Sequence, residues 1–202
     1  MTRAQIVTRI VKPLLFIACL TPVMLWPFID LGANPIEKLT HDSGQWALRF
    51  LLITLAITPL QKLTGIGELV RLRRMLGLYA FFYALAHASV YFILDQGLDF
   101  SAVIADVVER PYITIGFAVF VSLIPLAVTS TNGMIKRLGG KRWKRLHRLV
   151  YFSAIGGVLH CIWLVKADLR EPLIYLAILM LLLAFRAVPA ILRARVSRVS
   201  AA

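Results

Sequence analysis

Residues 75–94 read MLGLYAFFYALAHASVYFIL, a run of 20 residues that contains no Asp, Glu, Lys or Arg. Because an α-helix rises about 1.5 Å per residue, a run of this length crosses a hydrocarbon layer of about 30 Å. The run therefore predicts a transmembrane helix. It also places the imidazole of His87 inside that helix, at a depth where an ionisable side chain is costly.

Five further apolar runs extend this interpretation to the whole chain: 13–29, 46–63, 112–130, 149–165 and 173–192. The 202 residues are 59% hydrophobic and 16% charged, with a mean hydropathy of +0.79, which is typical of membrane proteins. We expect an all-α, six-transmembrane helix bundle that forms a single integral membrane domain over 1–202. The first run lacks a small-residue cleavage site and is interpreted as a retained anchor helix rather than a signal peptide.

Charge alternates between the segments that connect the runs. The basic residues gather in 3–12, 62–74, 136–148 and 193–198, whereas the acidic ones gather in 30–42, 95–109 and 168–171. Because basic loops stay in the cytoplasm, this alternation predicts a bacterial inner-membrane protein with cytoplasmic N- and C-termini. The net charge of +13 is thus explained by topology, and a nucleic-acid partner is not expected.

The connecting segments also limit the chemistry of the chain. Each is shorter than the about 50 residues that a minimal soluble domain needs, so any nucleotide-binding or substrate-reducing domain is expected on another chain. Cys19 and Cys161 lie in different apolar runs, where neither a disulfide nor a zinc site is expected.

Two intramembrane histidines are the main candidates for chemistry. His87 and His160 lie in runs that cross the membrane in the same direction, and they are expected at similar depth. Neutral imidazoles on facing helices are suitable axial ligands for one haem iron. No CxxCH sequence occurs, so this haem would be of the non-covalent b type. In the alternative interpretation, each imidazole only forms a hydrogen bond to a neighbouring helix.

A second haem is a more open question. His147 precedes His160 by 13 residues, or roughly 20 Å along a helix, which suits a second redox centre. The residue 14 positions before His87 is Arg73, and arginine is a poor iron ligand because it stays protonated. Alternatively, His147 belongs to a basic juxtamembrane segment, 141–148, that binds anionic lipid headgroups.

Three other polar residues are interpreted without a firm assignment to the haem. Arg49 either neutralises haem propionates or extends its charged end toward the aqueous phase, and Arg186 is equally ambiguous. His41 is expected to be a solvated residue of an outer loop.

Several sequence strings resemble a known family. They are Gly32-Ala33-Asn34-Pro35-Ile36-Glu37, Arg73-Arg74-Met75-Leu76-Gly77-Leu78 and Trp143-Lys144-Arg145-Leu146-His147-Arg148-Leu149-Val150-Tyr151. Together they resemble the haem-binding membrane subunit of the bacterial periplasmic methionine-sulfoxide reductase system. That family lies within the ferric reductase and NADPH oxidase transmembrane superfamily, and the resemblance covers nearly the whole chain.

The resemblance implies a function and a ligand set. The haem ligands would be His87, His160 and His147, with Arg73 where the larger superfamily has a fourth histidine. One or two b haems are implied, and FMN is implied by the resemblance alone. Electrons would come from the quinone pool or a cytosolic flavin reductase. They would pass to a periplasmic, molybdopterin-dependent methionine-sulfoxide reductase that repairs oxidised proteins.

Two further functions remain as alternatives. A stand-alone quinol or ferric oxidoreductase of the cytochrome b561 kind would reduce its acceptor without a dedicated soluble partner. A small-molecule transporter would use the buried histidines to bind substrate or relay protons.

Overall fold

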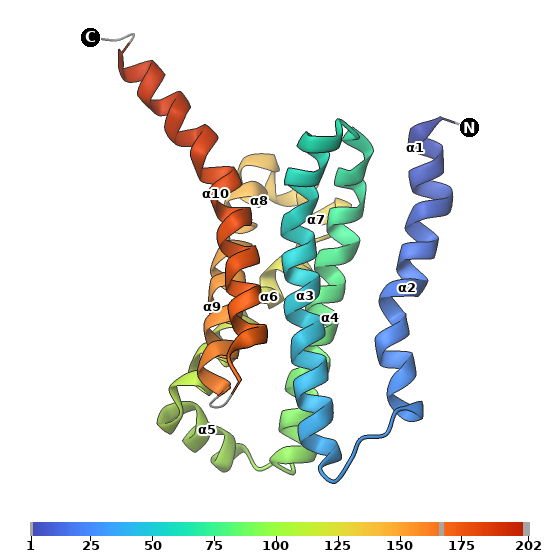
Figure 1. The fold of residues 1–202 in the computed structure, drawn as a ribbon, viewed down its shortest axis with the longest axis vertical. Helices are drawn as coiled ribbons and strands as arrows, with labels where there is room; N and C mark the ends of the chain where they lie inside the picture. Colours follow the sequence, from blue (N-terminus) through green and yellow to red (C-terminus); the bar gives the residue numbers. More distant parts are fainter. Residues whose placement is uncertain (1, 166–167, 200–202) are drawn as a thin grey trace.

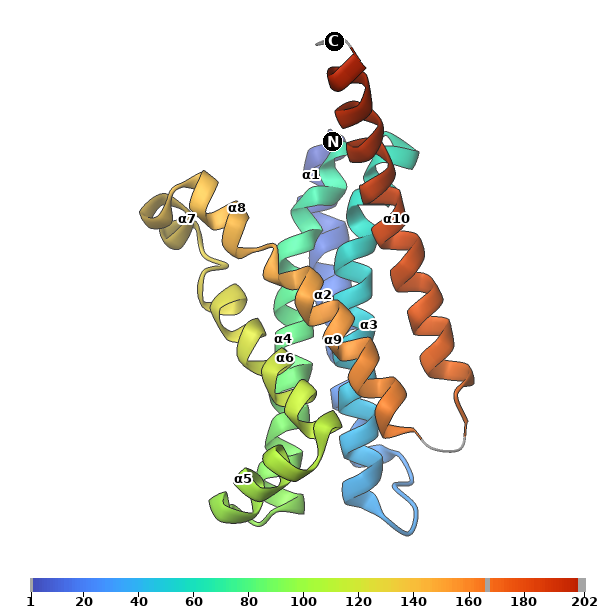
Figure 2. The same ribbon diagram turned by 90° about the vertical axis from the view of Figure 1, so that its left-hand side faces the viewer.

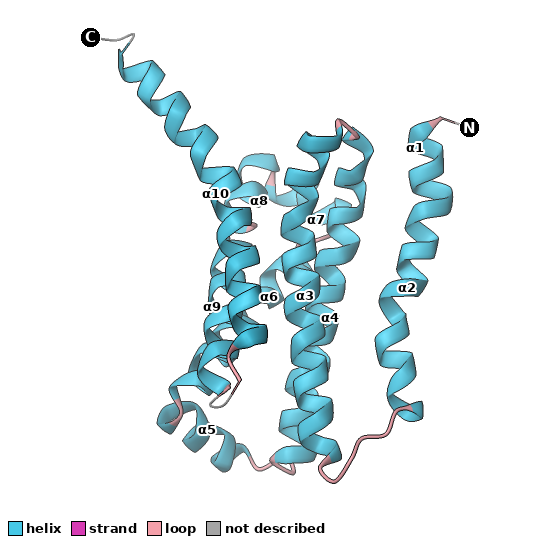
Figure 3. Cartoon of the chain, viewed as in Figure 1, coloured by secondary structure: helices cyan, strands magenta, loops and turns pink. Residues whose placement is uncertain are grey.

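A computed structural model describes residues 2–165 and 168–199, with side chains described up to residue 187. Within these ranges the protein is entirely helical, and Figure 3 shows helices joined by short connections. The all-helical prediction is therefore confirmed for the described part of the chain.

The first two membrane-crossing segments are long and nearly continuous helices. The first consists of α1 (Arg3–Ile6), η1 (Val7–Val11), α2 (Lys12–Leu25) and η2 (Trp26–Phe28). The second is α3 (Pro35–Thr64), which begins 11 residues before the apolar run predicted from residue 46. Asn34 caps this helix by accepting a hydrogen bond from the Glu37 backbone N–H at 3.3 Å. His41 consequently lies inside a helix, and its prediction as a loop residue is wrong.

The rest of the described chain contains seven more α-helices and two shorter helical segments. They are η3 (Gly67–Leu72), α4 (Arg73–Ser89), η4 (Val90–Asp95), α5 (Phe100–Glu109), α6 (Pro111–Val128), α7 (Asn132–Leu138), α8 (Gly140–Leu146), α9 (Leu149–Leu164) and α10 (Arg170–Val199). The sequence analysis did not predict α5, α7 or α8. All three lie in polar connections and are too short to cross a membrane.

Two antiparallel helix pairs form the centre of the bundle. α3 packs most extensively against α4, and α6 packs most extensively against α9 (Figures 1 and 2). The end of the bundle that carries α1, η3, α7 and α8 is called the basic end here. The opposite end, which carries α5 and the connection before α3, is called the acidic end.

Four helical segments in the described part of the chain are long and apolar enough to cross a membrane: Arg3–Phe28, Pro35–Thr64, Gly67–Asp95 and Pro111–Val128. Many large apolar side chains on these helices face outward, as expected for contact with lipid. The protein is therefore a multi-pass membrane protein. The last two apolar runs correspond to α9, which has only 16 residues, and α10, so the count of six spans remains a prediction.

Two tyrosines of α4 attach the first helix to the bundle. The fully buried Tyr83 hydroxyl accepts a hydrogen bond from the Val23 backbone N–H at 3.2 Å and donates one to the Cys19 carbonyl at 2.9 Å. Tyr79 donates to the Phe16 carbonyl at 2.9 Å. Pro22 interrupts the backbone hydrogen bonds of α2 at this level because proline has no N–H. Tyr83 therefore satisfies two polar groups beside the interruption.

Candidate functional site

The two intramembrane histidines face each other across the helix pairs. His87 belongs to α4 and His160 to α9. Their ring centroids are 6.1 Å apart, and the ring planes are inclined by 77°. The fold therefore brings together the two residues that the sequence singled out as a ligand pair.

A backbone carbonyl fixes the orientation of each imidazole. His87 Nδ1 lies 2.9 Å from the Thr40 carbonyl oxygen of α3, and His160 Nδ1 lies 2.7 Å from the Tyr112 carbonyl oxygen of α6. Because a carbonyl only accepts hydrogen bonds, each Nδ1 must donate its proton. Nε2 of each ring then keeps a free lone pair, which is the arrangement that metal-binding histidines adopt.

One glycine on each acceptor helix makes room for the imidazole. A Cβ atom on Gly44 would lie 3.1 Å from Cε1 and Nδ1 of His87, and one on Gly116 would lie 2.8 Å from the same atoms of His160. Each glycine comes four residues after the carbonyl acceptor, that is, one turn later on the same helix face. The sequence analysis missed both glycines. Both are glycines within a helix, and each lies against the ring of an intramembrane histidine on another helix. A glycine inside an apolar helix is the sequence signal that could have indicated them.

The imidazoles line a cavity of about 520 Å³. Its walls are mainly apolar, as in cofactor sites generally, and include Leu48, Leu51, Ala84, Phe117, Phe120 and Leu123. Polar groups that also line it are His41, Gln45, Asp95, Arg110, Asp168 and Glu171. Its volume falls in the range of about 300–1,000 Å³ that is usual for ligand pockets.

The ring separation agrees with two bonds to one metal ion. A metal–imidazole bond is about 2 Å long, so two opposed ligands place their nitrogens about 4 Å apart and their ring centroids roughly 6 Å apart. Within the described part of the chain, no cluster of three or more His, Cys, Asp or Glu side chains offers a site for a bare ion. A metal whose remaining positions are filled by a porphyrin needs only these two imidazoles, so the residues fit haem.

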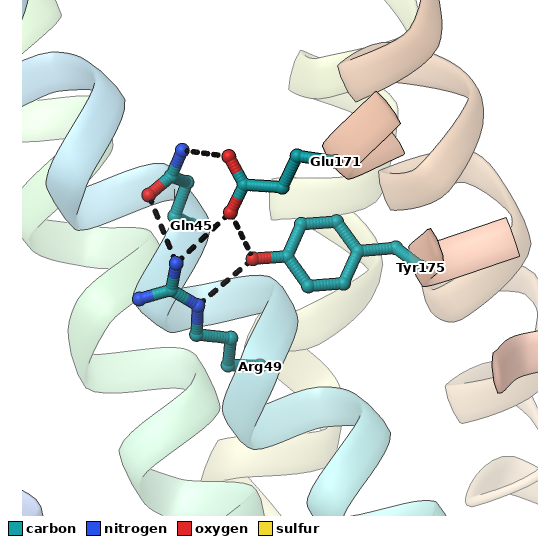
Figure 4. Close-up of polar contacts among 4 residues, drawn as sticks. All are labelled: Gln45, Arg49, Glu171 and Tyr175. Carbon is teal, nitrogen blue, oxygen red and sulfur yellow. Dashed lines mark hydrogen bonds and ion pairs between the residues drawn. The ribbon is translucent and has the colours of Figure 1, made fainter. Parts of the chain in front are cut away.

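Arg49 lies beside the cavity in a charged network that links α3 to α10 (Figure 4). Its guanidinium forms an ion pair with Glu171 at 2.9 Å and donates to the Tyr175 hydroxyl at 2.8 Å. Gln45 bonds to both charged partners, and Arg49 also lies 4.9 Å from the Trp46 ring centroid. The sequence did not reveal that Glu171, 122 residues away, balances this arginine.

His147 lies outside the group of described residues that line the cavity. It caps α8, and its ring stacks on Trp143 with centroids 3.8 Å apart. Its Nε2 lies 3.0 Å from the Thr129 hydroxyl, which already donates to the Pro125 carbonyl and therefore accepts the imidazole proton. Burial, and then the charges of Arg73 and Arg74, lower the pKa of His147, so this imidazole is neutral at physiological pH.

Arg73 is also distant from the cavity walls and contacts α3 through the Thr58 hydroxyl at 3.5 Å. The five residues proposed from the sequence therefore fall into three places. His87 and His160 share the cavity, Arg49 lies beside it, and His147 and Arg73 lie near the basic end.

Comparison with known proteins gives two findings. The ferric reductase like transmembrane component family matches residues 43–158, more than half of the chain. A protein-methionine-sulfoxide reductase heme-binding subunit MsrQ from Rhodospirillum rubrum is 54% identical over 194 residues, which cover 94% of this chain and 93% of the relative. This chain belongs to the MsrQ family.

Other members of the MsrQ family agree with this assignment. The protein of the same name from Herminiimonas arsenicoxydans is 52% identical over 88% of this chain and 84% of its own length. The one from Xanthomonas oryzae pv. oryzae strain MAFF 311018 is 48% identical over 88% of this chain and 86% of its own length. Since the ferric reductase match ends at residue 158, the helix that carries Glu171 lies outside that common domain.

Proposed function

We propose that this chain binds one b-type haem between His87 and His160 and transfers electrons as the membrane subunit of a methionine-sulfoxide reductase system. The observation that carries the proposal is the pair of imidazoles, each oriented by a backbone carbonyl, with ring centroids 6.1 Å apart across one apolar cavity. The names of the relatives, which describe heme-binding subunits, support the same cofactor.

The ligand set favours electron transfer over substrate chemistry. A bound haem would supply one-electron redox chemistry, and His87 and His160 would hold it. Because the chain itself supplies both candidate ligands, the site favours electron transfer over binding of a substrate at the metal. The two Nδ1 hydrogen bonds hold the rings in one orientation, so little rearrangement of the imidazoles is needed when charge arrives.

The proposal includes one haem and no flavin. His147 donates its Nε2 proton to Thr129 and stacks on Trp143, so the structure offers no facing imidazole for a second iron. The guanidinium of Arg73, which lies in the same region, offers only N–H donors and is a poor iron ligand. No feature of the described residues identifies an FMN site.

The distribution of charge supports a topology and two docking faces. We propose six membrane spans in a bacterial inner membrane, with the basic end and both termini in the cytoplasm. The electron donor, quinol or a cytosolic flavin reductase, would meet the basic end. The periplasmic molybdenum-containing catalytic subunit would meet the acidic end, where the cavity is lined by Asp95, Asp168 and Glu171.

An optical spectrum of the purified protein tests the cofactor. After haem-replete expression, the reduced protein should show a low-spin, bis-imidazole signature. His87→Ala and His160→Ala should each remove most of it, because one remaining imidazole cannot hold both axial positions. His41→Ala and His147→Ala are matched controls that should keep the signature. A colourless wild-type protein, or equal losses in all four variants, would reject the proposal.

Charge reversal tests the docking faces. Asp95→Lys together with Glu109→Lys should weaken capture of the soluble catalytic subunit by about tenfold or more, because like charges then face the partner. Arg137→Glu together with Arg142→Glu, at the basic end, should leave that capture unchanged. Equal capture by all three proteins in a pull-down would show that the acidic end is not the docking face.

A further inference from the structure

Three arginines lie near one another at the basic end: Arg186 is half-buried, whereas Arg73 and Arg74 are exposed. Arg186 of α10 is surrounded in sequence by apolar residues, and its guanidinium donates to the carbonyls of Leu182, at 3.2 Å, and Leu55. Its charged carbon lies 5.7 Å from the Tyr151 ring centroid. These contacts hold the guanidinium against α3 and α9 and keep it from extending freely into solvent.

Arg73 and Arg74 of α4 complete this group, called the arginine cluster here. Arg73 contacts Thr58, one turn from Leu55 on the same face of α3, and it is close enough to Arg186 for their charges to interact. Arg74 donates to the Asn132 side chain at 2.7 Å, and both α4 arginines act electrostatically on His147. Four separate elements, α3, α4, α7 and α10, therefore position three positive charges.

Among the described residues, none of these three arginines forms an ion pair. All three ion pairs in the described part of the chain, Arg49–Glu171, Arg110–Asp106 and Arg170–Asp168, lie at the acidic end. The sequence contains 10 Asp and Glu residues, and only Glu68, a half-buried residue of η3, belongs to the basic end. Clustered positive charges at the surface of a membrane attract an anion from outside the chain.

We propose that Arg73, Arg74 and Arg186 form a binding site for a phosphate group, borne by an anionic phospholipid headgroup or by a soluble phosphate ester. Guanidinium groups bind phosphate through paired, charge-assisted hydrogen bonds. Basic sites between helices at this level of a membrane protein are suited to anionic headgroups. Arg73 precedes His87 by 14 residues, so it lies roughly 20 Å from that imidazole along the helix axis.

This site is independent of the proposed haem. It uses none of the residues that line the cavity, and its test does not require a coloured protein. A failure of the haem proposal would therefore leave the phosphate proposal standing, and the reverse is equally true.

Native mass spectrometry of the full-length protein tests the site. In mixed micelles, the wild type should retain phosphatidylglycerol in preference to phosphatidylcholine. The double variant Arg73→Gln/Arg186→Gln should lose this retention by on the order of tenfold, since about 1.4 kcal/mol corresponds to a tenfold change and each lost charged hydrogen bond is worth at least as much. The control Arg137→Gln/Arg142→Gln makes the same change in charge at exposed positions of α7 and α8 and should behave as the wild type.

A second arm identifies the source of the phosphate. Inorganic phosphate, added in zwitterionic detergent without lipid, should raise the midpoint of thermal unfolding of the wild type if the site takes a soluble phosphate, and should leave it unchanged if the site needs a lipid. Arg73→Lys/Arg186→Lys keeps the charge without the paired geometry and should bind at an intermediate level, which separates lost binding from lost folding. Equal lipid retention by the glutamine double variant and its control, with no effect of phosphate on either, would overturn the proposal.

Discussion

Replacing Gly116 with alanine should abolish haem binding almost as completely as removing His160 itself. The new Cβ would lie 2.8 Å from Cε1 and Nδ1 of His160, closer than nonbonded carbon and nitrogen atoms can approach. The imidazole would have to swing away and break its hydrogen bond to the Tyr112 carbonyl. Its Nε2 would then no longer be directed at the position that it shares with His87.

A graded series of variants makes this test specific. Gly44→Ala should have a smaller effect, because its Cβ would lie 3.1 Å from the His87 ring. Gly77→Ala is the matched control, because its nearest neighbour is Thr54 Cγ2 at 3.7 Å, an ordinary contact, and Gly77 does not line the cavity. The measurement is the haem absorbance per protein chain after purification. Full absorbance for Gly116→Ala would show that the imidazole positions described here are not those of the haem ligands.

The second large effect is expected from Tyr83→Phe, which should loosen the first helix. The variant removes a fully buried hydroxyl that makes two hydrogen bonds, and leaves the Val23 N–H and the Cys19 carbonyl with only each other as helical partners. Each hydrogen bond that is lost contributes about 0.5–1.5 kcal/mol to stability. We expect a clear fall in the midpoint of thermal unfolding and faster proteolysis of the connection between α2 and α3.

Tyr79→Phe provides the comparison for this variant. The Tyr79 hydroxyl makes one hydrogen bond, to the Phe16 carbonyl, and it does not lie beside the proline interruption. Its removal should therefore cost less than the removal of the Tyr83 hydroxyl. If both variants unfold at the wild-type midpoint, the tyrosine hydroxyls do not hold the first helix.

The sequence predicted the helical membrane class and the facing histidines because both depend on local, repeated signals. An apolar run reveals its own length, and an ionisable side chain within it is conspicuous. His87 and His160 could be placed at equal depth because their helices cross in the same direction, which follows from the alternation of loop charge.

The details of the site depended on contacts between distant residues, which a single sequence does not show. Nothing near Arg49 indicates that its partner is Glu171 on another helix. Nothing in the sequence around Gly44 indicates that the His87 ring packs against it. The helix ends were also missed where capping rather than hydropathy sets them, as at Asn34 and at Asp99, which caps α5.

The pairing of Arg49 with Glu171 has a consequence for biosynthesis. The ribosome completes the arginine 122 residues before the glutamate, so α3 must enter the bilayer while its cation has no carboxylate beside it. The insertion machinery, or water held near the nascent helix, has to shelter that charge until α10 arrives. Truncating translation before residue 171 should thus leave α3 poorly retained in the membrane. Stable insertion of α3 would then depend on the later synthesis of α10.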